Sequence, residues 1–492
     1  MYTIKGKTGE WELVIALETH IEVLSNSKLF SGASADYNPT VSANTQVSMV
    51  DAAMPGMLPV LNRECVDQAI RFGLGINADI TRRSIFTRKQ YFYPDLPQGY
   101  QITQPADRPP IVGRGWVEIA GDDGNPKKIF IERAHLEQDA GKNIHDMNPS
   151  RSFVDLNRAG VCLLEIVNFI DIHNREENSF ISSPDEAERY LRTIREIARA
   201  TGVSKANMEE GSMRADVNVS VRLVGEKAFR TRTETKNMVS FKFIKTAIEF
   251  EARRQIEIYE SGGQVSQDTM HYNQNTGKTS VMRSKADALD YRHFPDPDLM
   301  PLIVSDEQIE KIRSAMPELP AAKRTRYVGD FGITEYDAAR LTESVEISDY
   351  FESAIGGKPE NAKLIANWVL GDLAAHPEYA MPAAYLAELV EMISANEING
   401  KQAKDLFIKM LEGESGNPRS IADKFGMKQI TDTGAIESAV NAVIAANPAQ
   451  VEQYRSGKTG ILGFLVGAVM KATGGKANPA VVNQIMTDKL KV

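Results

Sequence analysis

Residues 12–24 read Glu12-Leu-Val-Ile-Ala-Leu-Glu-Thr-His-Ile-Glu-Val-Leu24. Hydrophobic and polar side chains alternate through most of this stretch, which is typical of a β-strand that is buried on one face. One face carries Leu13, Ile15, Leu17, Ile21 and Val23, and the other carries Glu18, His20 and Glu22. The stretch therefore predicts a sheet with one hydrophobic face and one face that presents acids and an imidazole.

Two later stretches predict further strands of the same kind. Residues 161–172 predict a second strand, which carries Glu165. Residues 213–223 predict a third, in which valines alternate with polar side chains that include Arg214 and Asp216. Each of these strands is therefore also expected to have a polar face.

Helices are expected between and after these strands. Ser183-Pro-Asp-Glu186 predicts a helix start, and residues 237–261 predict a long amphipathic helix. Prolines at positions 295, 297, 301 and 317 then mark the exit from the mixed part of the chain. Further helices are predicted at residues 306–316, 334–342, 347–354, 361–373 and 383–396, and Gly400 opens another module of short helices. The predicted fold class is α+β, with a large mixed α/β domain followed by all-α modules.

Length and composition are those of an ordinary globular protein of several domains. The chain has 492 residues, of which 42% are hydrophobic and 25% are charged. No apolar run approaches the roughly 20 residues that a membrane-spanning helix needs, and the first residues have no signal-peptide core. Cys65 and Cys162 belong to no Cys-x-x-Cys pair, which excludes a zinc site built from cysteines. We expect a reducing, cytoplasmic location and no membrane association.

Charge is distributed unevenly along the chain. The net charge is −9, but residues 401–492 carry 12 Lys and Arg against 8 Asp and Glu, a net charge of +4, so the first 400 residues carry −13. An acidic body with a basic C-terminal module suits an enzyme that docks RNA through its tail. Random scatter of surface charge is the alternative.

A second informative stretch reads Arg88-Lys-Gln-Tyr-Phe-Tyr-Pro-Asp-Leu-Pro-Gln-Gly-Tyr-Gln-Ile-Thr-Gln104. It is too aromatic for a plain linker and too polar for a core strand. Its two prolines and Gly99 fix a rigid, irregular path. A rigid loop that carries Arg88 and Lys89 is suited to holding a phosphorylated or nucleotide ligand.

The acidic side chains suggest a divalent metal site. Glu18 and His20 can point into one cavity, and His135-Leu-Glu-Gln-Asp-Ala-Gly-Lys142 and Glu165 add further carboxylates. Several carboxylates near one imidazole repel one another unless a cation neutralises them. Mg²⁺ is preferred because oxygen ligands dominate and because it commonly bridges phosphates. The alternatives are a surface Glu–His pair and, at residues 135–142, a charged turn closed by Gly141.

Other kinds of chemistry are excluded. Gly277-Lys-Thr279 and Gly457-Lys-Thr459 look like the ends of P-loops, but Tyr272 and Glu452 stand where the first glycine is required. The sequence has no Gly-x-Ser-x-Gly signature and no glycine–serine-rich amidase stretch, and Cys162 is most simply a buried core residue. The chain thus suits a metal–phosphate site, whereas covalent acyl chemistry would need a partner.

Several separated motifs together resemble one family. In their order along the whole chain they are similar to the B subunits of the bacterial amidotransferases that act on aspartyl-tRNA(Asn) and glutamyl-tRNA(Gln). The motifs are Ile15-Ala-Leu-Glu-Thr-His20, Lys89-Gln-Tyr-Phe-Tyr-Pro-Asp95, Tyr100-Gln-Ile-Thr-Gln104, His135 to Lys142, Val154-Asp-Leu-Asn-Arg158, Glu209-Glu-Gly-Ser-Met-Arg214 and Gly463-Phe-Leu-Val-Gly467.

The resemblance implies a catalytic cradle domain at residues 1–298, a helical domain at 299–398 and a basic, tRNA-binding tail domain at 399–492. It also implies a carbon–nitrogen ligase that corrects a mischarged tRNA. ATP phosphorylates the side-chain carboxylate of Glu or Asp on the tRNA, and ammonia displaces the phosphate to give Gln or Asn. In the heterotrimer that the resemblance implies, an amidase partner would supply the ammonia from glutamine, and a small third protein would join the two larger ones.

The resemblance also assigns roles by position. It assigns Glu18, His20, Glu137 and Glu165 to Mg²⁺, Glu18, His20 and Lys89 to catalysis, and Lys89, Tyr91, Arg214 and Asp216 to ATP. Many relatives have Glu at the position of Gln138, and a neutral amide binds a cation more weakly than a carboxylate does. Some members hold zinc near Phe30-Ser-Gly-Ala-Ser34, but Ser31 and Ala33 cannot be ligands, so that site is not expected here.

Two other classes of protein stay open. A free-standing ATP-dependent ligase or kinase would turn over ATP without tRNA. A non-catalytic tRNA-binding scaffold would leave all the chemistry to the amidase partner. The basic tail disfavours the first class, and the clustered carboxylates disfavour the second.

Overall fold

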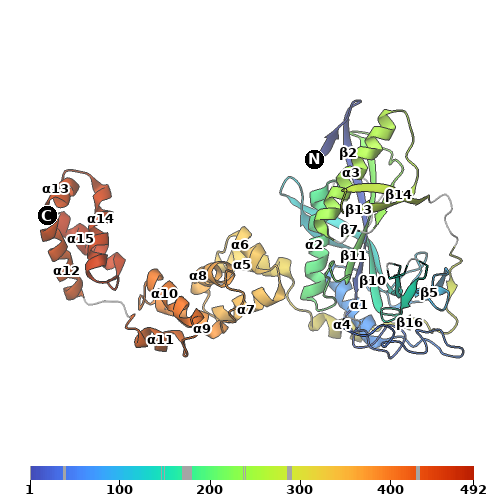
Figure 1. Ribbon diagram of the computed structural model, residues 1–492, viewed down its shortest axis with the longest axis horizontal. Helices are drawn as coiled ribbons and strands as arrows, with labels where there is room; N and C mark the ends of the chain where they lie inside the picture. Colours follow the sequence, from blue (N-terminus) through green and yellow to red (C-terminus); the bar gives the residue numbers. More distant parts are fainter. Residues whose placement is uncertain are drawn as a thin grey trace. The chain divides into compact units, whose positions relative to one another are not determined.

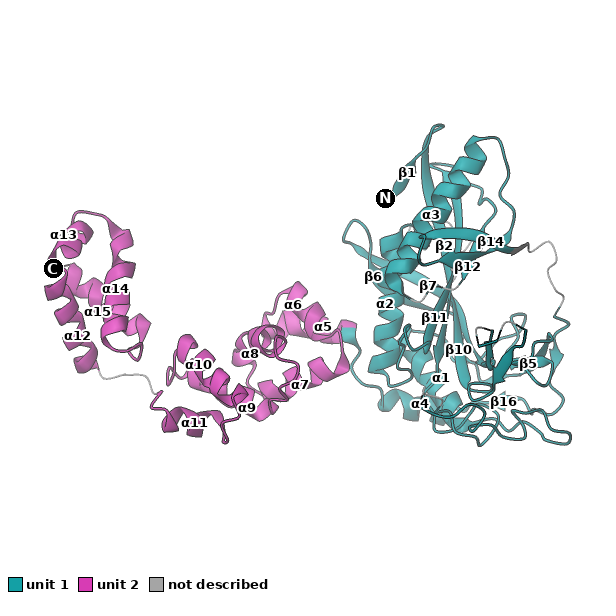
Figure 2. Ribbon diagram, in the orientation of Figure 1, with its two compact units in different colours: residues 1–320 teal, residues 321–492 magenta. Residues whose placement is uncertain are grey.

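The computed structural model divides the chain into two compact units, Met1–Pro320 and Ala321–Val492 (Figure 2). It describes residues 2–491 apart from 37–39, 146, 149, 169–179, 237, 239, 285–290 and 428–432. No helix in the described part of the chain is both long enough and apolar enough to cross a bilayer.

The first unit is built on a mixed sheet of 12 strands. The strands are β1 (Thr3–Lys5), β2 (Glu10–Glu22), β4 (Thr87–Gln90), β5 (Tyr100–Thr103), β6 (Gly115–Ala120), β7 (Pro126–Gln138), β10 (Cys162–Asn168), β11 (Met213–Leu223), β12 (Thr233–Lys236), β13 (Asp268–Asn273), β14 (Lys278–Ser284) and β15 (Phe294–Pro295). The main path runs β14-β13-β12-β11-β2-β10-β7-β5-β4-β15, with β1 beside β2 and β6 beside β7. Neighbours are antiparallel except for the parallel pair β12–β13.

The first predicted strand is the centre of this sheet. β2 lies between β10 and β11, so both of its edges are hydrogen-bonded within the sheet. Its side chains Leu13, Ile15, Leu17 and Ile21 are fully buried, as the alternation predicts. Two short ribbons accompany the sheet, β3 (Arg83–Ser84) with β16 (Leu302–Ile303) and β8 (Lys142–Ile144) with β9 (Phe153–Asp155).

Helices cover the hydrophobic face of the sheet (Figure 1). They are α1 (Arg63–Gly75), α2 (Pro184–Ala200) and α3 (Phe241–Glu260), with α4 (Asp306–Ser314) beside α1. α2 begins as predicted, because the hydroxyl of Ser183 accepts a hydrogen bond from the backbone N–H of Glu186. α3 begins later than predicted because Ser240 caps it in the same way. Glu18 and His20 lie on the opposite, polar face of the sheet.

The second unit is all-helical. It contains α5 (Pro320–Phe331), α6 (Glu335–Leu341), α7 (Val345–Ile355), η2 (Pro359–Asn361), α8 (Ala362–Trp368), η3 (Val369–Leu373), α9 (Ala383–Ser394), α10 (Gly400–Leu411), α11 (Pro418–Lys424), α12 (Thr433–Ala446), α13 (Pro448–Arg455), η4 (Thr459–Ile461), α14 (Leu462–Ala472) and α15 (Pro479–Leu490). Two separate hydrophobic cores lie within it. The first ends with Ala422, so α10 and α11 belong to it, and the second begins with Ile436.

The α+β prediction is confirmed by this architecture. The five helices predicted between residues 306 and 396 all exist, although 361–373 is divided among η2, α8 and η3. The helices α1 and α5 were not predicted. The strand predicted at 161–172 ends at Asn168, and residues 169–172 lie outside the described part, as does Asn237 at the predicted start of α3. The domain boundaries at 298 and 398 stay predictions.

Candidate catalytic and metal-binding site

The register of the sheet brings the polar side chains together. His20 of β2 stands opposite Glu165 of β10 on one side and opposite Arg214 of β11 on the other. Glu165 in turn stands opposite His135 of β7. Directly paired residues of antiparallel strands point to the same face. These four side chains therefore form one row across four strands, on the face away from the buried Leu17.

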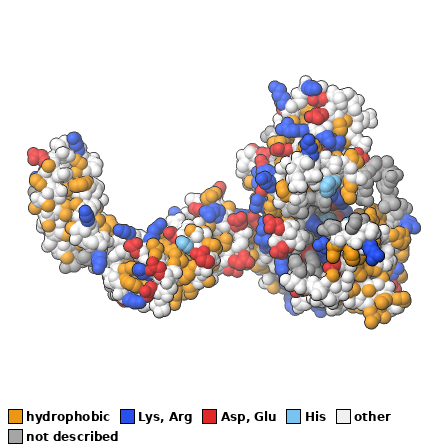
Figure 3. Space-filling view, viewed as in Figure 1, with side chains coloured by type: hydrophobic (Ala, Val, Ile, Leu, Met, Phe, Trp, Pro, Cys, Tyr) orange, Lys and Arg blue, Asp and Glu red, His pale blue; other side chains and the backbone are white. Residues whose placement is uncertain are grey.

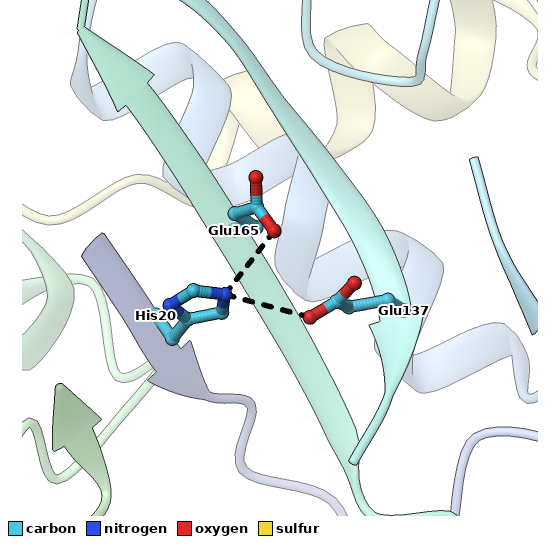
Figure 4. A group of neighbouring side chains, drawn as sticks. All are labelled: His20, Glu137 and Glu165. Atoms are coloured by element: carbon cyan, nitrogen blue, oxygen red, sulfur yellow. Dashed lines mark hydrogen bonds and ion pairs between the residues drawn. The ribbon is translucent and has the colours of Figure 1, made fainter. Parts of the chain in front are cut away.

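Three side chains converge at the centre of this face (Figure 4). His20 Nε2 lies 3.1 Å from Glu165 Oε2 and 3.6 Å from Glu137 Oε1. One ligand atom from each of the three residues lies within 4.8 Å of those from the other two. The three come from β2, β7 and β10, so 145 positions separate the first from the last. We call His20, Glu137 and Glu165 the triad.

Burial and close charges set the protonation of the triad. Burial disfavours the charged form of His20, but the hydrogen bond and charge of Glu165 outweigh it and raise the pKa of His20 to about 9. Burial, followed by the charge of Glu165, raises the pKa of Glu137 to about 7. Burial also opposes the ionisation of Glu165, but its neighbours, among them His20 and Lys89, hold its pKa below the ordinary value.

The triad has the donor set of a divalent cation site. Two carboxylate oxygens and one imidazole nitrogen suit Mg²⁺ or Mn²⁺. The carboxyl of Glu137 resists ionisation beside Glu165, and a cation between them would remove that repulsion. The residues present therefore fit a bound metal ion.

His135 is a part of this site that the sequence does not single out. Its Nε2 lies 3.7 Å from Glu165 Oε2 and 3.9 Å from Glu137 Oε2. Burial lowers its pKa to about 4, and its Nδ1 has no hydrogen-bond partner among the described residues. His135 lies two residues before Glu137 on the same strand, and residues two apart on a strand share a face. That spacing could have predicted His135 as a part of the site.

The predicted ligand Glu18 lies on the same face, but it is not in the triad. Its Oε1 accepts a hydrogen bond from Asn218 Nδ2 at 3.5 Å. Burial, and then the charges of Glu165, Glu234 and Asp216, raise its pKa. Its assignment to the metal stays a prediction.

Lys89 and Tyr91 lie beside the triad. The ammonium group of Lys89 lies near two aromatic rings. Its Nζ is 5.1 Å from the ring centre of Tyr291 and 5.9 Å from the ring centre of Tyr91. The positive charge of Lys89 favours the ionised forms of Glu137 and Glu165, and in Glu137 it opposes the larger effect of burial, which raises the pKa. Within the described residues Lys89 forms no ion pair, so its ammonium is available to a ligand.

Arg214 and Asp216 are held in ion pairs at the wall of the site. Arg214 Nη2 lies 2.8 Å from Asp139 Oδ2, and Lys236 Nζ lies 2.6 Å from Asp216 Oδ2. Asp216 also acts on the triad, since its charge helps to raise the pKa of His20. The structure thus places both residues near the site, and their assignment to ATP stays a prediction.

Gln138 points away from the triad. It follows Glu137 on β7 and therefore belongs to the opposite face of the sheet. There it lines a pocket of about 370 Å³ together with Asp51, Tyr100 and Gly160. The amide at this position is on the wrong face to act as a ligand of the triad.

Comparisons with known proteins identify the family of this chain. Residues 13–310 match the family model of the GatB/GatE catalytic domain, and residues 349–490 match that of the GatB domain. The chain is 52% identical to the B subunit of the aspartyl/glutamyl-tRNA(Asn/Gln) amidotransferase of Sinorhizobium fredii, over 99% of this chain and 97% of that protein. It is 50% identical to the proteins of the same name from Gluconobacter oxydans, over 99% and 98% of the two chains, and Rhodospirillum rubrum, over 99% of both.

The first family match includes all three residues of the triad, and the first relative matches 99% of the chain. The chain therefore belongs to the family of the B subunits of tRNA-dependent amidotransferases.

Proposed function

We propose that this chain activates and amidates the amino acid of Glu-tRNA(Gln) and Asp-tRNA(Asn), giving Gln-tRNA(Gln) and Asn-tRNA(Asn). The observation that carries the proposal is the partly buried triad, together with the neighbouring ammonium of Lys89, which forms no ion pair within the described residues. The names of the relatives specify both aminoacyl-tRNAs. The nitrogen comes from glutamine that the amidase partner hydrolyses, and the small third protein joins that partner to this chain.

In the first step, an oxygen of the substrate's side-chain carboxylate attacks the γ-phosphorus of ATP. The bond to the β–γ bridging oxygen breaks, and ADP leaves an acyl phosphate behind. Lys89 offers a fixed positive charge to the phosphoryl oxygens. The triad would hold Mg²⁺, which when bound draws negative charge from the ATP phosphates.

In the second step, ammonia attacks the carbonyl carbon of the acyl phosphate. A carbon–nitrogen bond forms, the carbon–oxygen bond to phosphate breaks, and the nitrogen loses a proton. Glu137 is buried, and the side chains of His20 and Glu165 are only 19% and 16% exposed, which limits the access of water to the acyl phosphate.

The test is amidation by the heterotrimer with ammonium chloride in place of glutamine, so that the amidase partner is not needed for the chemistry. The double variant His20→Asn/Glu165→Gln and the single variant Lys89→Met should each lower ATP-dependent amidation at least ~100-fold. Mn²⁺ binding, followed by electron paramagnetic resonance, should be lost in the double variant and kept in Lys89→Met.

Glu118→Gln is the matched control, because Glu118 is an exposed acid on β6 of the same sheet. It should amidate at the wild-type rate. Wild-type amidation by the double variant would remove the triad from the mechanism and would favour the non-catalytic scaffold.

The C-terminal part of the chain is proposed to bind the tRNA. Its net charge of +4 over residues 401–492 supports this role. On the face drawn in Figure 3, Lys and Arg side chains of the second unit are scattered among acidic and apolar ones. On this face, several separate phosphate contacts therefore suit the chain better than one concentrated basic patch.

A further inference from the structure

The only two cysteines of the chain meet in the first unit, although they lie far apart in the sequence. Cys65 belongs to the first turn of α1, and Cys162 is the first residue of β10. Both are free and fully buried, and the thiol of Cys162 forms a hydrogen bond with the sulfur of Cys65. Two free thiols in direct contact are the reactants of a disulfide bond.

The segment that follows β2 holds the two cysteines in place. The backbone N–H of Val23 donates to the carbonyl of Cys162 at 2.9 Å, so β10 begins beside the end of β2. Two residues later, Ser25 Oγ lies 3.6 Å from Cys65 Sγ. The same short segment therefore contacts both cysteines and fixes the spacing between α1 and β10.

The two thiols differ in how readily they ionise. The hydrogen bond from Cys162 lowers the pKa of Cys65 despite the burial of its sulfur. The position of Cys65 in the first turn of α1 acts in the same direction, because the helix dipole favours a negative charge there. Burial instead raises the pKa of Cys162. Cys65 is therefore the nucleophile of the pair, and Cys162 is the thiol that keeps its proton.

The two thiols also differ in how close they lie to solvent. Arg63 and Glu64, which precede Cys65 on α1, are exposed, and Ser25 is half-buried. A small local opening of this turn is enough to admit a molecule of the size of hydrogen peroxide. Cys162 begins a strand that lies between β2 and β7, so the sulfur of Cys65 shields it from solvent better than Cys65 itself is shielded.

We propose that hydrogen peroxide oxidises Cys65 and Cys162 to a reversible disulfide that links α1 to β10. The Cys65 thiol loses its proton, and the thiolate attacks one oxygen of the peroxide. The O–O bond breaks, and the hydroxide that leaves takes up a proton, which gives water and a sulfenic acid at Cys65.

The second step closes the bridge. The sulfur of Cys162 attacks the sulfur of Cys65, the sulfur–oxygen bond breaks, and the released hydroxide takes the proton of Cys162. In total the two thiols lose two electrons and two protons, and the peroxide becomes two molecules of water.

The bridge lies on the side of the sheet away from the triad. Cys162 and Glu165 are three residues apart on β10 and therefore point to opposite faces. Both edges of β10 are hydrogen-bonded, to β2 and to β7, so the end of α1 adjusts more easily than the strand does. We therefore expect the disulfide to fasten α1 to the sheet without displacing Glu165.

The test is peptide mapping of this chain within the heterotrimer after exposure to hydrogen peroxide. The exposure is chosen so that it oxidises both cysteines of the chain when the chain is unfolded in urea. After catalase removes the peroxide, the complex is unfolded in N-ethylmaleimide, which blocks every remaining thiol, and is digested without reductant. Most wild-type chains should yield the two cysteine peptides joined to each other, and dithiothreitol should restore both thiols. A sample without peroxide controls for oxidation during the work-up.

Two variants separate the roles of the thiols. In Cys162→Ala, oxidation of Cys65 should continue to the sulfinic acid, because the thiol that resolves the sulfenic acid is missing. In Cys65→Ala, Cys162 should stay a thiol under the same exposure. The corresponding serine variants carry this comparison if an alanine variant fails to assemble.

Stability and activity show whether the bond fits the native fold. The bridge closes a loop of about 100 residues in the unfolded chain, so the thermal midpoint of the first unit should rise by about 3–6 °C. The oxidised complex should amidate Glu-tRNA(Gln) from ammonium chloride within about twofold of the reduced complex. The double variant Cys65→Ala/Cys162→Ala, exposed in the same way, is the matched control for oxidation elsewhere in the complex.

Two thiols that both react with N-ethylmaleimide in the exposed wild type would overturn the inference, and so would a bond from Cys65 to another chain. A lower thermal midpoint of the oxidised chain would also overturn it, because the bond would then distort the native fold. None of these results would touch the proposed amidation, which is measured on the reduced complex.

Discussion

His20 shows how the fold alters the chemistry of a single residue. Its raised pKa means that the folded chain holds a proton more tightly than the unfolded chain does. The stabilisation from protonated His20 is therefore fully present below pH 6.5 and is lost as the pH rises through about 9. In the presence of EDTA, the thermal midpoint of the first unit should fall between pH 7 and 9.

The variant His20→Asn should flatten this decrease. Glu137 acts in the same direction but at lower pH, since its raised pKa places its contribution between about 4.5 and 7. A decrease of equal size in wild type and His20→Asn between pH 7 and 9 would contradict the assignment.

A buried ion pair is the second feature at the scale of residues. Lys28 and Asp51 are both buried, and Lys28 Nζ lies 3.3 Å from Asp51 Oδ2. Asp51 also accepts hydrogen bonds from the hydroxyl of Ser31 and the backbone N–H of Ser48. Asp51→Ala leaves the Lys28 charge buried without its partner and should destabilise the first unit by about 3–5 kcal/mol.

Thermal unfolding with and without Asp51→Ala measures this loss. The double variant Lys28→Met/Asp51→Ala should recover part of the stability, because it no longer buries a lone charge. A double variant that is less stable than Asp51→Ala would contradict this explanation.

At the scale of elements, the alternation within β2 predicts which side chains share a face but not which strands become its neighbours. Glu165 could be placed on a strand from its own stretch, whereas its position opposite His20 depends on register. Glu137 came from the resemblance, and His135 was missed. Nothing local in the sequence indicates that Tyr291 meets Lys89, because about 200 residues separate them.

Helices were predicted where start signals and periodicity agree. α2 has Ser183, Pro184 and two acids at its start, and its prediction holds. α5 was missed because it begins at Pro320, within a stretch whose prolines indicate a domain exit. A proline is favourable in the first turn of a helix, so the same residue supports both interpretations.

The segment 291–298, which we call the strap, is an element with a predictable role. The strap runs beside β4. The N–H of Gln90 donates to the carbonyl of Tyr291, and Arg88 forms ion pairs with Asp296 and Asp298. The strap thereby holds the ring of Tyr291 beside the ammonium of Lys89. Tyr291→Leu should raise KM for ATP about threefold to tenfold, through loss of a cation–π contact of about 1 kcal/mol.

Tyr291→Phe is the conservative comparison, because it keeps the ring and removes only the hydroxyl. It should restore most of the affinity for ATP, with kcat close to wild type in both variants. Equal KM values for the leucine and phenylalanine variants would show that the ring does not position Lys89.

At the scale of the whole molecule, the two helical cores decide where the tail can be removed. Leu406, Phe407 and Ile421 are buried in the first helical core, so a cut near residue 399 would expose it. A chain that ends at Met427 keeps this core and removes 7 Lys and Arg with 4 Asp and Glu. Its tRNA affinity should fall at least ~10-fold, with a shallower dependence on salt concentration.

Filter binding at several salt concentrations measures both quantities. Circular dichroism of the shortened chain checks that the remaining helices are intact. Unchanged affinity and an unchanged salt slope would place tRNA binding elsewhere in the chain.

The central place of β2 also has a consequence for synthesis on the ribosome. Its neighbour β10 begins about 140 residues after β2 ends, and β11 begins about 190 residues after it. At about 5–20 residues per second, the ribosome needs roughly 10–40 s to deliver β11. Until β10 and β11 emerge, β2 exposes its hydrophobic face and unpaired edges, which invites pairing between neighbouring nascent chains. We therefore expect β2 to need the protection of a chaperone before translation ends.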